Sequence, residues 1–96
     1  MRYGTRVRSG DIELIYKKTN TIPRFAIVVS TKIDKRATRR NRIRRIVSES
    51  LRHLLPVVVP VDGVLIVRRN ITDLKQVELE SFVFELFSKV HLLNHE

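Results

Sequence analysis

The segment from about residue 36 to residue 54 restricts the possible folds of this chain more than any other segment does. It contains no glycine or proline and stops before Pro56, so the sequence predicts a helix. At about 100° per residue, one stripe of this helix consists of Ile43, Ile46, Val47, Ser50 and Leu54. The opposite side consists of Asn41, Arg42, Arg45, Glu49 and Arg52. We therefore expect the helix to pack by its aliphatic stripe and to show a basic face to solvent.

Three other segments have the patterns of β-strands. Residues 11–18 alternate, with Ile12, Leu14 and Tyr16 on one side and Glu13, Ile15 and Lys17 on the other. Residues 25–30 form an apolar run typical of a central strand, and residues 64–67 form another after a turn marked by proline and glycine. A further short strand is predicted at residues 6–8.

A second helix is predicted over residues 74–93, with Thr72 or Asp73 as its N-cap. Its expected core stripe consists of Leu79, Phe82, Val83, Leu86, Phe87, Val90 and Leu93. Phe84 lies off this stripe.

The order β-β-α-β-α predicts an α+β fold, a small mixed β-sheet packed by two helices. The strand at residues 64–67 follows a helix, so it can pair in parallel with an earlier strand. A length of 96 residues suits one domain over residues 1–96. The chain has no cysteine, no secretory signal and no apolar run of the roughly 18 residues that span a bilayer, so the cytoplasm is the expected compartment.

The charge of the chain is concentrated in one region. Nineteen basic and ten acidic residues give a net charge of +9. Residues 30–54 hold nine basic and two acidic residues, which is +7 of that total. Such a local excess favours a nucleic-acid partner over a solvated face kept for solubility, because a solubility face more often mixes both signs.

Six of the ten residues from 36 to 45 are arginine. The guanidinium group grips phosphate oxygens with two parallel hydrogen bonds and stacks on bases. Asn41 adds a donor and an acceptor at the middle of the cluster. The alternative for Arg36 and Arg40, which lie near the apolar stripe, is that they only cover the core.

These motifs, in this order, resemble the bacterial ribonuclease P protein family. The resemblance rests on Ser30-Thr31-Lys32-Ile33, Arg40-Asn41-Arg42-Ile43-Arg44-Arg45, Glu49, Arg52 and the segments 62–68 and 74–93. It covers nearly the whole chain and implies the ribosomal protein S5 domain 2-like fold, here without the family's N-terminal helix. The chain departs from the family at residues 34–36, which replace a glycine turn, and at Ser48, where many relatives carry a basic residue.

The resemblance also implies a division of labour between protein and RNA. A partner ribonuclease P RNA holds the catalytic Mg²⁺ ions and removes the 5′ leader of precursor tRNA, while the protein binds both RNAs and holds no metal or cofactor itself. The implied RNA-binding residues are Lys32, Lys35, Arg36, Arg39, Arg40, Asn41, Arg42, Arg44, Arg45 and Arg52. The implied leader-binding residues are Tyr16, Arg40, Asn41 and Arg44, with Tyr16 stacking on a base. The alternative for Tyr16 is a half-buried sheet tyrosine.

The sequence shows no protein active site, because its carboxylates are scattered over turns and caps. His91 and His95 lack a third ligand for a metal. No membrane or protein partner is evident. The main rival interpretation is a non-enzymatic ribosomal-type protein that binds rRNA through the same basic helix. A helix-turn-helix DNA-binding protein is disfavoured, because a strand precedes the basic helix.

Overall fold

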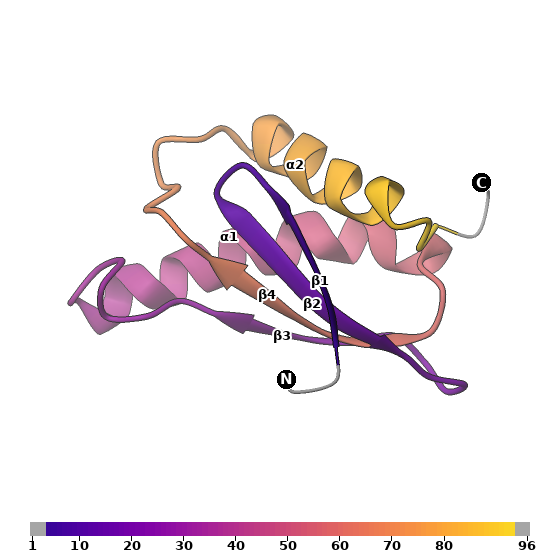
Figure 1. The fold of residues 1–96 in the computed structure, drawn as a ribbon. Coiled ribbons are helices and arrows are strands. Elements are labelled where there is room, and N and C mark those ends of the chain that lie inside the picture. Colours follow the sequence, from indigo (N-terminus) through magenta and orange to yellow (C-terminus); the bar gives the residue numbers. More distant parts are fainter. Residues whose placement is uncertain (1–3, 94–96) are drawn as a thin grey trace.

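The computed structural model describes residues 4–93, and in it a four-stranded sheet carries both helices on one face (Figure 1). The elements are β1 (Thr5–Ser9), β2 (Ile12–Lys18), β3 (Arg24–Val28), α1 (Ala37–Leu54), the 3-10 turn η1 (Leu55–Val57), β4 (Val61–Val67) and α2 (Gln76–Lys89). The predicted α+β class is confirmed. The short strand considered at residues 6–8 is present as β1, so the full order has one strand more than β-β-α-β-α.

The strands lie side by side in the order β1-β2-β4-β3. β4 pairs antiparallel with β2 and parallel with β3, which confirms the expected parallel pairing of the strand that follows α1. The sheet is therefore mixed, with β1 and β3 at its two edges.

The core lies between the sheet and the two helices. α1 packs against β3 and α2, and α2 packs against β1 and β2. On α1, Ile43, Val47 and Ser50 are buried as predicted. Ile46 is only partly buried, whereas Leu51, which the predicted stripe omits, is buried, so the buried side of the helix is rotated slightly from the expected one.

One glycine fixes the packing of an aromatic ring in the sheet. Gly63 on β4 lies between Tyr16 on β2 and Phe25 on β3. A Cβ atom at this position would lie 2.6 Å from the ring of Phe25. That ring in turn contacts Phe87 of α2 edge to face, with centroids 5.5 Å apart. The missing side chain of Gly63 thus makes room for Phe25 between sheet and helix.

α2 begins later than the sequence predicts, and its N-cap is Lys75 rather than Thr72 or Asp73. Asn70 Oδ1 accepts hydrogen bonds from the backbone N–H (3.1 Å) and hydroxyl (2.7 Å) of Thr72, which holds that residue in a turn. Glu78 then accepts a hydrogen bond from the backbone N–H of Lys75 at 3.0 Å, and this closes the first turn of the helix.

α2 also ends at Lys89, four residues before the predicted end at residue 93. His91 adopts a left-handed backbone conformation with φ of 57°, which stops the helix. Leu92 and Leu93 are nevertheless buried, and Leu92 accepts a backbone hydrogen bond from Val59 at 2.8 Å. His95 lies outside the described residues.

Candidate nucleic-acid interface

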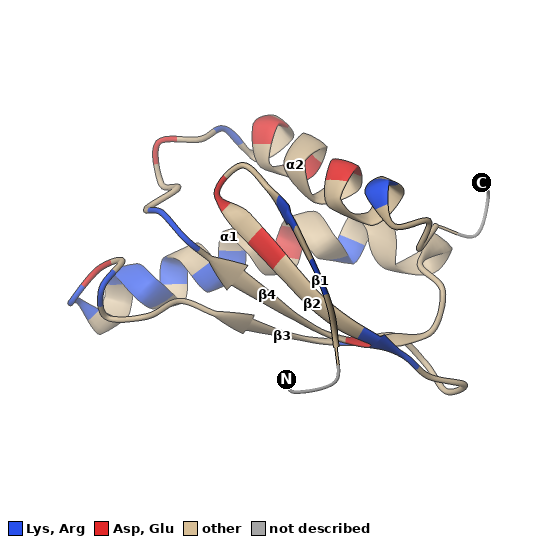
Figure 2. Cartoon of the chain, in the orientation of Figure 1, with Lys and Arg blue, Asp and Glu red and all other residues tan. Residues whose placement is uncertain are grey.

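The basic residues are most concentrated in the loop from β3 to α1 and in the first half of α1, as Figure 2 shows. The loop turns through Asp34 rather than through glycine. The Asp34 carboxylate accepts hydrogen bonds from the backbone N–H of Arg36 at 2.9 Å and from its Nε at 3.2 Å. These contacts, first of all the guanidinium of Arg36, hold the pKa of Asp34 below its usual value. Asp34 therefore stays ionised and fixes the turn that leads into α1.

Arg40 fastens this loop to the helix. Its Nη1 donates to the backbone carbonyl oxygens of Asp34 (3.1 Å) and Lys35 (2.9 Å). These two bonds satisfy carbonyl groups of the turn and hold the partly buried side chain in one position. Arg40 is thus built into the scaffold that presents its neighbours.

Asn41 and Arg44 are neighbours on one side of α1. Arg44 Nη1 donates a hydrogen bond to Asn41 Oδ1, which is the contact expected for residues three apart on a helix. Asn41 is exposed, and its amide nitrogen has no protein acceptor within residues 4–93. The pair can therefore offer several donors to one acceptor group.

In the loop and the first half of α1, five basic side chains are exposed and have no ion-pair partner within residues 4–93. They are Lys32, Lys35, Arg39, Arg42 and Arg45, and we call them the basic cluster. They come from the loop and from the solvent side of the first half of α1. A phosphate that approaches them does not have to displace a carboxylate, so their charge is available to a polyanion.

Arg52 does not join this cluster. It forms an ion pair with Glu49, and the contact lowers the pKa of the Glu49 carboxyl and raises the pKa of the Arg52 guanidinium. It also lies seven residues beyond Arg45, which is about 10 Å along the helix axis. Arg36 is likewise paired, with Asp34.

The face of the sheet that lies away from the helices is a second surface with basic groups, and we call it the open face. Its centre is apolar and comes from Ala26, Val28, Val64 and Ile66, whereas Ile15 beside them is buried. Arginines from β1 and from the end of β4 border it: Arg6 and Arg68 both pair with Glu13, at 3.2 Å and 3.0 Å. The hydrogen bond from Arg68 is the main reason that the pKa of Glu13 lies below its usual value.

At the other end of the open face, Arg24 forms an ion pair with Asp62 at 3.1 Å. A shallow groove of about 380 Å³ lies between β3 and β4 there, and its lining includes Ala26 and Val64. None of these basic side chains was among the predicted site residues. The alternation of Arg6 and Arg8 along β1 is a usable signal, because residues two apart in a strand lie on one face.

Tyr16 does not offer an exposed ring. Its side chain faces the helices together with Ile12 and Leu14, and only 8% of its surface is exposed. The expectation of a base stacked on this ring is therefore wrong in this structure. Strand alternation places Tyr16 on the face that α1 and α2 cover, which is the sheet-tyrosine alternative.

Within residues 4–93, no three histidine or acidic side chains are grouped so that they could hold a metal ion. No helix in this part of the chain is both long and apolar enough to cross a membrane. The side chains of the loop and of α1 offer guanidinium, ammonium and amide groups, which can donate hydrogen bonds to phosphates and base edges.

Sequence comparisons identify relatives of this chain. A family model described as Ribonuclease P matches residues 1–91. The ribonuclease P protein component of Xylella fastidiosa is 33% identical over 90 residues, which cover 94% of this chain and 67% of that protein. The component from Xanthomonas euvesicatoria is 38% identical over 68 residues, 69% of this chain and 47% of that protein. The match with the Xanthomonas relative thus spans about half of that protein's length.

Structural comparisons agree on the fold. The RNase P protein from Thermotoga maritima superposes with a TM-score of 0.82 at 23% identity, over 92% of this chain and 84% of that one. The Staphylococcus aureus RNase P protein superposes with a TM-score of 0.79 at 20% identity, over 97% and 86% of the two chains. Since the family model spans nearly the whole sequence, the chain belongs to the bacterial ribonuclease P protein family.

Proposed function

We propose that this chain is the protein subunit of a ribonuclease P ribonucleoprotein and that it binds the catalytic RNA through the basic cluster. The observation that carries the proposal is that these five cations are exposed and have no carboxylate partner within residues 4–93. Most other arginines in that range are tied to acidic side chains or to backbone carbonyls. Folded RNA presents closely spaced phosphates, and such a set of free cations suits that partner.

In this proposal the two subunits divide the work. The RNA holds the Mg²⁺ ions and cleaves the phosphodiester bond, and the protein contributes binding and positioning in the cytoplasm. Arg40 has a positioning role: its bonds to the carbonyls of Asp34 and Lys35 set the direction of the loop that carries Lys32 and Lys35.

The same proposal gives the 5′ leader of precursor tRNA a path over the open face, instead of a stack on Tyr16. The apolar centre of that face can contact bases without reading their sequence, and the bordering arginines can reach the phosphates. Asn41 and Arg44 then offer further donors where the leader passes α1. Val28 at the exposed edge strand β3 is 43% exposed, so an RNA strand can reach this part of the surface directly.

Reconstitution tests the proposed function. The protein alone is expected not to cleave precursor tRNA, whereas the protein together with a bacterial ribonuclease P RNA should support cleavage at Mg²⁺ concentrations at which that RNA alone is inactive. The Arg42→Gln/Arg45→Gln double variant should need more protein for the same rate. Arg52→Gln is the matched control, because Arg52 is already paired with Glu49. Cleavage by the RNA-free protein, or no effect of the protein on the RNA, would refute the proposal.

A further inference from the structure

A groove between α1 and α2 is apolar and acidic, in contrast to the basic cluster. It has a volume of about 560 Å³ and is open to solvent. Leu54 of α1 and Val77 and Phe84 of α2 supply its apolar walls, and Glu80 and Glu85 supply its charged groups. Within residues 4–93, no lysine or arginine lines it.

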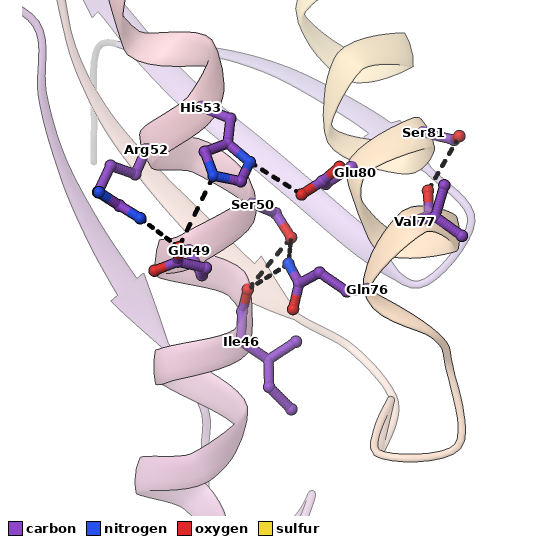
Figure 3. Close-up of polar contacts among 9 residues, drawn as sticks. All are labelled: Ile46, Glu49, Ser50, Arg52, His53, Gln76, Val77, Glu80 and Ser81. Atoms are coloured by element: carbon purple, nitrogen blue, oxygen red, sulfur yellow. Dashed lines mark hydrogen bonds and ion pairs between the residues drawn. The ribbon is translucent and has the colours of Figure 1, made fainter.

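Polar contacts between the two helices hold the groove open (Figure 3). Gln76 Nε2 of α2 donates to the hydroxyl of Ser50 on α1 at 2.5 Å. One helical turn further along, His53 Nδ1 donates to Glu80 Oε2 at 3.0 Å. These contacts fix the spacing of the helices, so the groove is preformed and does not depend on a ligand to open it.

The charge around the groove is negative although the chain as a whole carries +9. α2 holds Glu78, Glu80 and Glu85 against the single cation Lys89, and Figure 2 shows this contrast with the first half of α1. Glu85 accepts a hydrogen bond from the neutral hydroxyl of Ser9 at 2.8 Å, which leaves its charge uncancelled. Nucleic acid and anionic lipid are therefore poor occupants of this surface.

The apolar side chains of the groove are exposed and are not needed for the core of the domain. Val77 is 65% exposed and Phe84 is 47% exposed, and neither belongs to the core of the domain. Two large apolar side chains beside carboxylates on one helix form a surface that complements an apolar side chain flanked by cations.

We propose that the α1–α2 groove docks a protein segment in which an aliphatic or aromatic side chain lies between lysines or arginines. Phe84 and Val77 receive the apolar side chain, and Glu80 and Glu85 receive the flanking cations. This is a protein-binding surface separate from the RNA-binding one, and it stays accessible when the basic cluster is covered. A second copy of this chain is disfavoured, because the proposed function assigns RNA to both of the basic surfaces described above, the basic cluster and the open face.

The test uses two synthetic peptides of twelve residues, one alternating leucine with lysine and the other alternating leucine with glutamate. Binding to the RNA-free protein is followed by NMR chemical shifts and by calorimetry. The lysine peptide should shift signals of Val77, Ser81 and Phe84 against the overall repulsion of a protein with charge +9. The glutamate peptide should not shift these signals, even though the protein's net charge attracts it.

Two substitutions at exposed positions then locate the site. Phe84→Ala should lower the affinity of the lysine peptide about five- to tenfold, because it removes an apolar wall of the groove. Ser81→Lys should lower this affinity by a similar factor, because the new lysine repels the lysines of the peptide. Arg42→Ala is the matched control and should leave peptide binding unchanged, while Ser81→Lys should leave RNA binding within about twofold. Equal binding of both peptides, shifts confined to other surfaces, or indifference to both groove variants would overturn the proposal. None of these outcomes depends on the RNA-binding assay.

Discussion

The salt dependence of RNA binding follows from the number of free cations, and it gives the sharpest test of the basic cluster. Each phosphate neutralised by a cation releases bound counterions, so the logarithm of affinity falls with the logarithm of salt by about 0.9 per contact. Five contacts, one for each side chain of the cluster, give a slope of about −4.5. Between about 50 and 200 mM salt the affinity for ribonuclease P RNA should then fall roughly 500-fold.

Removal of two cations should change this slope by a predictable amount. The Arg42→Gln/Arg45→Gln variant keeps three cations of the cluster, so its slope should be about −2.7 and its loss over the same salt range roughly 40-fold. Filter binding at five or six salt concentrations measures both slopes. Arg52→Gln should keep the wild-type slope, because Arg52 is engaged by Glu49 and lies apart from the cluster. A flat salt response of the wild type, or a double variant with an unchanged slope, would refute this assignment of the phosphate contacts.

Three further predictions concern stability. The contact with Arg68 lowers the pKa of Glu13 in the folded protein. The stabilisation of the fold by this carboxylate is therefore complete above the ordinary pKa of 4.5 and is lost as the pH falls through the lower folded value. Glu13→Gln should reduce the acid dependence of the unfolding free energy, measured in denaturant titrations at several pH values. Ile43→Ala should cost about 2–5 kcal/mol in the same titrations because Ile43 is fully buried, and the partly buried Ile46→Ala should cost clearly less. Tyr16→Ala should likewise destabilise the fold, by about 3–5 kcal/mol, whereas a variant with wild-type stability would mean that its ring is not in the core.

The fold was largely predictable from periodicity, because strands and helices bury side chains at different spacings. The limits of this signal are visible at particular residues. The alternation of β2 separates Ile12, Leu14 and Tyr16 from the opposite side correctly, but it does not tell which side the helices cover. Which side of β2 the helices cover depends on contacts between distant segments. This determines whether the ring of Tyr16 lies in the core or on an exposed surface. The prediction of where α2 starts was wrong for a related reason. The turn made by Asn70 and the hydrogen bond between Glu78 and Lys75 override the better capping propensity of Thr72 and Asp73.

The site was predictable in location but not in detail. Counting charges finds the arginine-rich segment, because a local excess of one sign needs no structure to be recognised. It does not show that Arg40 is bound to two carbonyl groups, or that Arg36 is paired with Asp34. The open face was missed because its side chains come from four strands, and only the pairing register brings Arg6, Arg68 and Val28 onto one surface.

That open face yields a prediction about the leader which separates it from Tyr16. Val28→Glu places a negative charge on the exposed edge strand, and it should weaken binding of precursor tRNA that keeps its 5′ leader by about five- to a hundredfold, the range expected when one base contact is lost. Val28→Lys is the matched control: it makes the same position polar but attracts phosphate, so it should not weaken binding. Mature tRNA, which lacks the leader, should be indifferent to both changes. Affinity measurements with the reconstituted ribonucleoprotein on both substrates decide the matter. If Val28→Glu and Val28→Lys weaken binding equally, the position acts through stability and the leader takes another path. If instead a Tyr16 variant of unchanged stability discriminates between the two substrates, the ring must leave the core to meet the leader.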